Sequence, residues 1–211
     1  MTIQKKFLIA LVAFICVFLV IRTSVIWYET KQEVSNEVEL QKNMMVDKVS
    51  SLLNVTNDIM SERVVSSLTL LKQRAANLGS PSLGESVSVN GTSARNIMIG
   101  DYSVANNYAL VDGLTEVMGG TATIFSKQGD DFIRISTNVM KEGKRATGTK
   151  LSPSGKAMAA IKQKKAYFGQ VDILGKPYLT AYDPIIDSNG DVIGIWYVGY
   201  SANLGVLAEQ I

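Results

Sequence analysis

The chain carries little of the side-chain chemistry on which most enzymes and metal sites depend. Its 211 residues include no histidine and a single cysteine, Cys16. Histidine is the commonest general base and the commonest metal ligand, so its absence excludes Ser-His-Asp and Cys-His catalysis and any zinc site that uses histidine. One cysteine can form neither an internal disulfide nor a four-cysteine cluster. We therefore expect no enzyme, no metal site and no cofactor.

Candidate binding residues occur around one arginine within an apolar run, FIRIST at residues 132–137. Strand alternation predicts Phe132, Arg134 and Ser136 on one face of a strand, with Thr137 and the two isoleucines on the other. An unpaired buried charge is very costly. Arg134 must therefore face solvent, pair with a carboxylate of the chain, or bind an anion.

More polar side chains that suit an anion lie nearby in the sequence. Arg145 occurs in the segment that follows Arg134. A second group alternates along one face of a later predicted strand: Lys176, Tyr178, Thr180 and Tyr182. A guanidinium matches a carboxylate with two parallel hydrogen bonds, and hydroxyls add directed ones. These residues predict a pocket in which Arg134 and Arg145 clamp a small carboxylate.

The residues beyond Gly120 predict the sheet that positions this pocket, because apolar residues occur there in short β-rich runs separated by turn residues. A short helix is predicted from Ser152-Pro153 to about Lys164. The predicted strands are 121–127, 132–137, 166–171, 178–185 and 192–200. Their order predicts an α+β domain, with an antiparallel sheet of about five strands and helices on one face.

The segment before this sheet is predicted to be mainly helical. Residues 29–78 contain neither Gly nor Pro, apolar residues recur at helical spacing, and Gly79-Ser80-Pro81 follows as a stop signal. We expect the second half of this helix to pack on its own domain and the first half to be available to a second copy. Residues 80–95 are predicted to be a loop with one short strand at 87–89. A helix over 104–118 follows, with Ser103 as its N-cap.

The N-terminus is predicted to hold a membrane helix. Residues 7–28 are almost continuously apolar and about as long as the roughly 20 residues that span a bilayer. Lys5 and Lys6 precede them, which predicts a cytoplasmic N-terminus. A cleaved signal peptide is the alternative, but bulky Ile26, Trp27 and Tyr28 occupy the place of its small-residue cleavage site. We expect a single-pass protein of the inner (cytoplasmic) membrane, with the remaining domain periplasmic or extracellular.

Several strings together resemble a known family: TATIF, FIRISTN, GKRATGT, ILGKPYLTAYDPI and GDVIGIWYVGY. They resemble the single Cache sensor domains, type 3, of bacterial methyl-accepting chemotaxis receptors, over about residues 106–201. The resemblance implies a PAS-like extracytoplasmic fold with a long first helix, usually dimeric, that binds small molecules and often organic acids. The pocket residues that it implies are Arg134, Ser136 and Thr137 from one strand, Arg145 from the next loop, and Lys176, Tyr178 and Tyr182 from the GKPY strand.

We therefore expect five regions: a cytoplasmic N-terminus 1–6, a transmembrane helix 7–28, a membrane-proximal helix 29–79, a sensor core 80–201 and a tail 202–211. The predicted function is small-molecule sensing of the chemoreceptor type, which supports signal transduction or chemotaxis. The expected partners are a small organic acid, the membrane, a second copy in a homodimer and a separate receptor or kinase. The net charge of +2 predicts no nucleic acid.

Two alternatives stay open at this point. The domain could instead be a ligand-free module that pairs with a receptor or kinase through its long helix. Receptors of this family also continue into a second transmembrane helix and signalling domains, whereas the sequence ends at Ile211. This predicts either a stand-alone anchored sensor or a truncated receptor.

Overall fold

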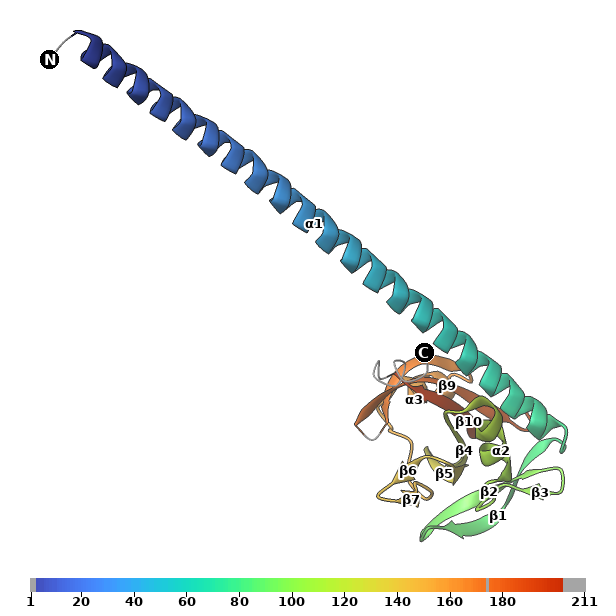
Figure 1. Ribbon diagram of the computed structural model, residues 1–211. Helices are drawn as coiled ribbons and strands as arrows, with labels where there is room; N and C mark the ends of the chain where they lie inside the picture. The colour runs from blue at the N-terminus through green and yellow to red at the C-terminus, as the bar shows by residue number, and fades with distance from the viewer. Residues whose placement is uncertain (1–2, 174, 203–211) are drawn as a thin grey trace. The chain divides into compact units, whose positions relative to one another are not determined.

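The computed structural model describes residues 3–173 and 175–202, apart from the side chains of residues 4–10, 12–13 and 33–36. The chain forms two compact units, Met1–Thr56 and Asn57–Ile211. Helix α1 (Ile3–Ala76) makes up the described part of the first unit and opens the second. The elements that follow are labelled in Figure 1: β1 (Pro81–Val89), β2 (Thr92–Ile99), β3 (Tyr102–Ser103), α2 (Ala109–Met118), β4 (Thr121–Gln128), β5 (Asp131–Thr137), β6 (Met140–Lys141), β7 (Lys144–Arg145), α3 (Lys156–Lys162), β8 (Tyr167–Ile173), β9 (Lys176–Ile186) and β10 (Val192–Ser201).

Helix α1 confirms the prediction of a long helix over residues 29–78 to within two residues at its C-terminal end. Within the second unit, one stripe of α1 is buried at a spacing of three or four residues, and it consists of Val64, Leu68, Leu71 and Ala75. This spacing matches the 3.6-residue turn, so one helix face packs on the domain as predicted. Among the described residues, no helix has a stretch long and apolar enough to cross a membrane. Part of the predicted membrane segment 7–28 lies outside the described structure, namely the side chains of residues 7–10 and 12–13. Residues 203–211 of the predicted tail also lie outside the described residues.

The main sheet has five antiparallel strands in the order β5-β4-β10-β9-β8. All five correspond to the predicted strands, so the α+β prediction is confirmed. Helix α2 begins later than predicted, and Tyr108 rather than Ser103 is its N-cap. The reason is that backbone amides just before α2 form hydrogen bonds with neighbouring strands. The amide of Val104 donates to the carbonyl of Ile97 in β2, and the amide of Asn106 donates to the carbonyl of Ile135 in β5.

A second sheet, β1-β2-β3, occupies a region that was predicted to be a loop with one short strand. The predicted strand 87–89 is the C-terminal end of β1, and the rest of this sheet was not predicted. The prediction missed the Asn90-Gly91 turn, which joins β1 to β2. Both residues have positive φ, 49° and 80°, as a two-residue hairpin turn requires. The small polar residues of β1 hid the strand, because most of them stay exposed.

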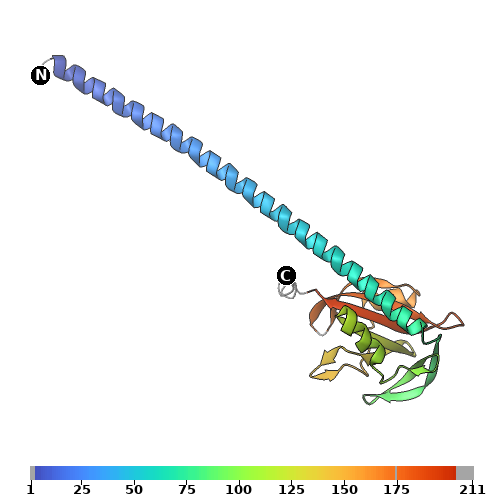
Figure 2. The same cartoon turned by 45° about the vertical axis from the view of Figure 1, so that its right-hand side comes forward.

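Two hydrophobic clusters lie on the two faces of the main sheet. The first includes the buried stripe of α1, α2 and residues of β1 and β2. Figures 1 and 2 show α2 beside the last turns of α1. The second cluster includes Ala157, Met158 and Ile161 of α3. The prediction that all helices cover one face is therefore wrong for α3, which packs on the opposite face together with the candidate site.

Candidate ligand-binding site

A β-bulge in β5 determines which predicted site residues share a face. Phe125 pairs with Arg134, but the next residue back in β4, Ile124, pairs with Ser136, so Ile135 is the extra residue. Paired residues of antiparallel strands project to the same face. Ser136 therefore joins Ile124 on the α2 side, where its hydroxyl donates to the carbonyl of Asn107 at 2.7 Å.

The bulge also returns Thr137 to the face of Arg134. Thr137 pairs with Thr123, and the two buried hydroxyls lie 2.6 Å apart. The prediction that Arg134 shares a face with Ser136 is therefore wrong, because simple alternation does not count an extra residue. Thr137, predicted on the opposite face, takes that place.

Arg134 lies in a largely apolar and aromatic environment. Its guanidinium carbon is 4.9 Å from the centre of the Phe125 ring. Nη1 donates to Oγ1 of Thr149 at 2.7 Å, whereas Nε is buried without a hydrogen-bond partner. Burial lowers the pKa of the Arg134 guanidinium below its usual range, because desolvation disfavours the charged form. Among the described residues, no carboxylate forms an ion pair with Arg134.

Two buried tyrosines complete the surroundings of Arg134. The rings of Tyr182 and Tyr197 are 4.8 Å apart, and Tyr182 is also 6.5 Å from Phe125. Burial raises the pKa of Tyr182 to about 12 and raises that of Tyr197 as well. Both phenols are therefore neutral at physiological pH, and neither supplies a negative charge to Arg134.

An open cleft of about 620 Å³ borders this aromatic group. It lies between the β6–β7 hairpin and the start of β9, and its lining includes Thr121, Asn138, Val139, Met140, Lys141, Glu142, Ile173, Lys176 and Tyr178. Its floor is continuous with the aromatic group, because Val139 and Ile173 belong to the same buried cluster as Tyr182 and Tyr197. The hydroxyl of Thr121 also lies 3.1 Å from that of Tyr197. The volume is in the range of small-molecule pockets, and two lysines against one glutamate give the lining a positive balance.

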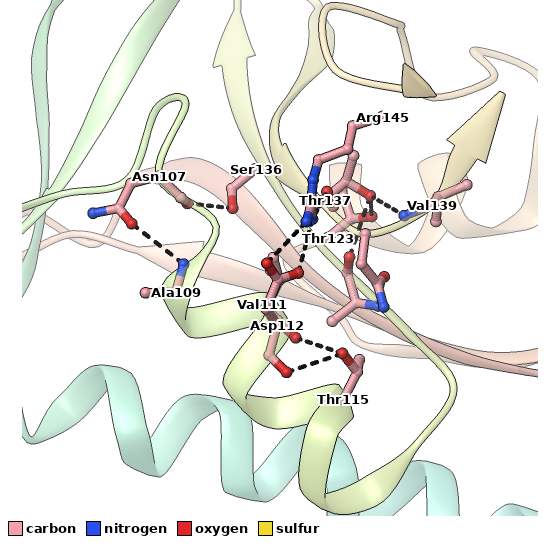
Figure 3. Close-up of polar contacts among 12 residues, drawn as sticks. Asn107, Ala109, Val111, Asp112, Thr115, Thr123, Ser136, Thr137, Val139 and Arg145 are labelled. Atoms are coloured by element: carbon pink, nitrogen blue, oxygen red, sulfur yellow. Dashed lines mark hydrogen bonds and ion pairs between the residues drawn. The ribbon is translucent and has the colours of Figure 1, made fainter. Parts of the chain in front are cut away.

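Arg145 is engaged elsewhere, as Figure 3 shows. Its Nη1 and Nη2 donate to Oδ1 and Oδ2 of Asp112 at 2.7 and 2.9 Å, and Nη1 also donates to the carbonyl of Thr137 at 2.9 Å. The guanidinium carbon lies 4.2 Å from the centre of the Tyr108 ring. Arg145 therefore joins the base of the hairpin to α2, and its planar fork is already filled by a carboxylate of the chain.

The structure thus brings Arg134, Thr137 and Tyr182 to one sheet face, with Lys176 and Tyr178 in the adjoining cleft. It separates Ser136, on the other face, and Arg145, which is paired. Sequence reasoning did not identify the neighbours Phe125, Thr149 and Tyr197 or the counter-ion Asp112. Phe125 and Tyr197 alternate with core residues in predicted strands, and this alternation could have placed both on the sheet face that holds Arg134. Thr149 lies in a loop, so no sequence pattern indicated that it contacts Arg134.

Comparison with known proteins identifies the fold family. The model of the family described as the Cache 3/Cache 2 fusion domain matches residues 28–211. The chain belongs to this family. The match confirms the resemblance to Cache domains that the sequence indicated. This Cache domain is also similar to the crystal structure of the E. coli DcuS sensor domain, with 16% identity, coverage of 48% of this chain and 69% of that chain, and a TM-score of 0.37. No curated protein matches the chain.

Proposed function

We propose that this Cache domain is a sensing module that binds a small organic acid beside Arg134. The observation that carries the proposal is a half-buried guanidinium whose Nε is fully buried without a hydrogen-bond partner and which has no carboxylate partner among the described residues. An uncompensated buried charge lowers stability, so its retention is explained if an anion binds there. Membership of the Cache family supports the same proposal, because the resemblance noted in the sequence links such domains to small-molecule sensing.

The neighbouring groups suit a carboxylate of a few carbon atoms. The Thr137 hydroxyl shares the face of Arg134, and Tyr182 offers a neutral phenol that can donate. Lys176 and Tyr178 line the cleft and can hold a second polar end of the ligand. Arg145 is assigned a different part in the proposal from the one the sequence predicted. Because Asp112 already neutralises it, Arg145 shapes the wall of the site and does not clamp the ligand.

The exposed face of α1 supports a homodimer. Three strongly exposed apolar residues recur every seven positions, Val38, Met45 and Leu52, with exposed fractions of 61, 69 and 67%. A seven-residue apolar repeat is the pattern of a coiled-coil seam. We therefore include pairing through α1 with a second copy in the proposal; a separate receptor or kinase helix is the other partner that this face would suit.

A membrane-anchored, extracytoplasmic placement and a part in chemotaxis or related signal transduction complete the proposal. They rest on the sequence: the apolar segment 7–28, the lysines that precede it and the resemblance to chemoreceptor domains. Resistance of the chain to alkaline extraction from membranes, with the domain cut by protease only from the outer side, would support this placement. Release of the chain by alkali would contradict it.

Calorimetric titration of the full chain in mild detergent with carboxylates of two to six carbons tests the ligand assignment. At least one acid should bind saturably, and Arg134→Met should weaken it at least about 30-fold, since losing one partner of a buried charge pair costs about 2 kcal/mol or more. Arg95→Met, at an exposed arginine outside the site, is the matched control and should leave the affinity unchanged. Equal binding to wild type and Arg134→Met, or no binding by any acid, would refute the assignment.

A further inference from the structure

Helix α2 is held at its first turn by the β6–β7 hairpin, through the pair between Asp112 and Arg145 (Figure 3). Met140, Lys141 and Glu142 of the same hairpin line the cleft, so one side of the cleft is mechanically tied to α2. The tie has directional strength, because two parallel charge-assisted hydrogen bonds fix both distance and angle.

The last turn of α2 is held by two other elements. The carbonyl of Met118 accepts hydrogen bonds from Nη2 of Arg63 in α1 at 3.0 Å and from Oη of Tyr200 in β10 at 2.9 Å. The Tyr200 hydroxyl also lies 2.6 Å from the buried hydroxyl of Ser67 in α1. Since the single phenolic proton is donated to the carbonyl, Ser67 must donate to Tyr200. Arg63 also lies over the Tyr200 ring, at 4.9 Å.

Little in this arrangement can absorb a movement between the two ends. Helix α2 has ten residues, about 15 Å of regular helix, and its inner face is buried through Leu110, Val111 and Leu114. The chain then passes so close to β10 that a Cβ on Gly120 would lie 2.7 Å from both the Gly199 carbonyl oxygen and the Tyr200 ring. A tilt or shift at the first turn is therefore transmitted to the last turn.

We propose that α2 is the coupling element of this domain, which links the cleft-lining hairpin to α1 and to the last residues of β10 through Arg63, Ser67 and Tyr200. The proposal rests on the proposed function only for what moves the hairpin: an anion near Lys141 and Lys176 draws it across the cleft, and Arg145 carries Asp112 with it. Asp112, Arg145 and Tyr200 are thus positioning residues that do not touch the ligand.

Hydrogen–deuterium exchange of the full chain in detergent, without any ligand, tests the coupling. Asp112→Asn keeps the side-chain shape but removes the charge pair. We expect amides of residues 63–71 in α1 to exchange about five-fold faster, although the Asp112 carboxylate pairs with the hairpin and not with that segment. Tyr200→Phe should, in turn, accelerate exchange over residues 137–146, because coupling between two sites is reciprocal.

Two control variants separate coupling from simple destabilisation. Asp131→Asn removes the Lys150–Asp131 pair, which lies at the start of β5 and does not involve α2, and should leave residues 63–71 unchanged. Ile161→Val loosens the core on the opposite sheet face and should change exchange near α3 first. The coupling is refuted if Asp112→Asn affects only α2 and the hairpin, or if it accelerates exchange equally in all segments, those near α3 included. The exchange experiment uses no ligand, so it can support the coupling even if no carboxylate binds in the calorimetric titration. Equally, a carboxylate can bind in the titration even if the exchange experiment refutes the coupling.

Discussion

Replacing Arg134 with methionine should weaken ligand binding and yet leave the ligand-free domain as stable as before or slightly more stable. Methionine keeps an unbranched side chain of similar reach and removes the charge. The expectation follows from the environment of Arg134: one side-chain hydrogen bond, one aromatic contact, a buried Nε without a partner and no carboxylate partner among the described residues.

The magnitude follows from two interactions that methionine cannot make and from the burial penalty that it removes. The hydrogen bond to Thr149 involves a charged group and contributes about 1.5–3 kcal/mol. The cation–π interaction with Phe125 contributes about 0.5–2 kcal/mol. An uncompensated buried charge costs about 3–5 kcal/mol. The midpoint of the penalty, about 4 kcal/mol, lies slightly above the midpoint of the summed interactions, about 3.5 kcal/mol. We therefore expect a small net stabilisation of about 0.5 kcal/mol, or about 1–2 °C in Tm.

Urea denaturation of the ligand-free chain, followed by circular dichroism, measures this difference. Arg95→Met is the matched control, because Arg95 is exposed, and it should change the free energy of unfolding by no more than about 0.5 kcal/mol. A decrease of more than about 2 kcal/mol in Arg134→Met would show that Arg134 is a satisfied structural residue. Arg134 would then need no ligand anion, and the proposed binding site would be refuted.

Three further predictions concern other parts of the chain. Burial raises the pKa of Tyr182 to about 12, so the folded chain keeps a proton on Tyr182 that the unfolded chain releases near pH 10. Tyr182 by itself should therefore contribute a loss of about 2–3 kcal/mol of stability between pH 10 and 12 in urea titrations, and Tyr182→Phe should lack that part of the loss. Leu52→Asp should dissociate the proposed dimer in sedimentation velocity, whereas Ser51→Asp beside it should not; an unchanged dimer would contradict pairing through this face of α1. Gly194→Ala should destabilise the domain by about 1–3 kcal/mol, because a Cβ there would lie 2.3 Å from a backbone oxygen of β4. Gly155→Ala is the control, because its Cβ would meet nothing closer than 3.5 Å. Equal stability of the two variants would argue against this packing of Gly194.

The elements that the sequence predicted well are those with a strong local signal. Residues 29–78 lack Gly and Pro and Gly79 follows them, so the sequence itself signals both the helix and its C-terminal end. The five main strands combine β-branched or aromatic residues with clear turns. In both cases local preference and the final packing agree, and the prediction succeeds for that reason.

The elements that the sequence did not predict depend on contacts between distant residues. The residues predicted to form the first turn of α2 instead form a non-helical turn at 105–106, because Ile97 and Ile135 supply carbonyls to the amides of residues 104 and 106. Simple alternation does not hold through β5, because Ile135 is an extra residue in its register with β4 and a bulge has no strong sequence signal of its own. Arg145 looked free in sequence because its partner, Asp112, lies 33 positions earlier on a helix.

The two arginines show why composition alone cannot distinguish a binding residue from a structural one. Both are followed closely by threonine, and both lie against an aromatic ring. Asp112 places two carboxylate oxygens on Arg145, so this arginine contributes to the fold whether or not a ligand is present. Arg134 has one hydrogen bond from Nη1 and a buried Nε without one, so the fold gains little from its charge. If a bound acid completes that coordination, binding replaces an interaction that folding leaves unmade. The affinity for the acid and the stability of the empty domain should then change in opposite directions when Arg134 is replaced.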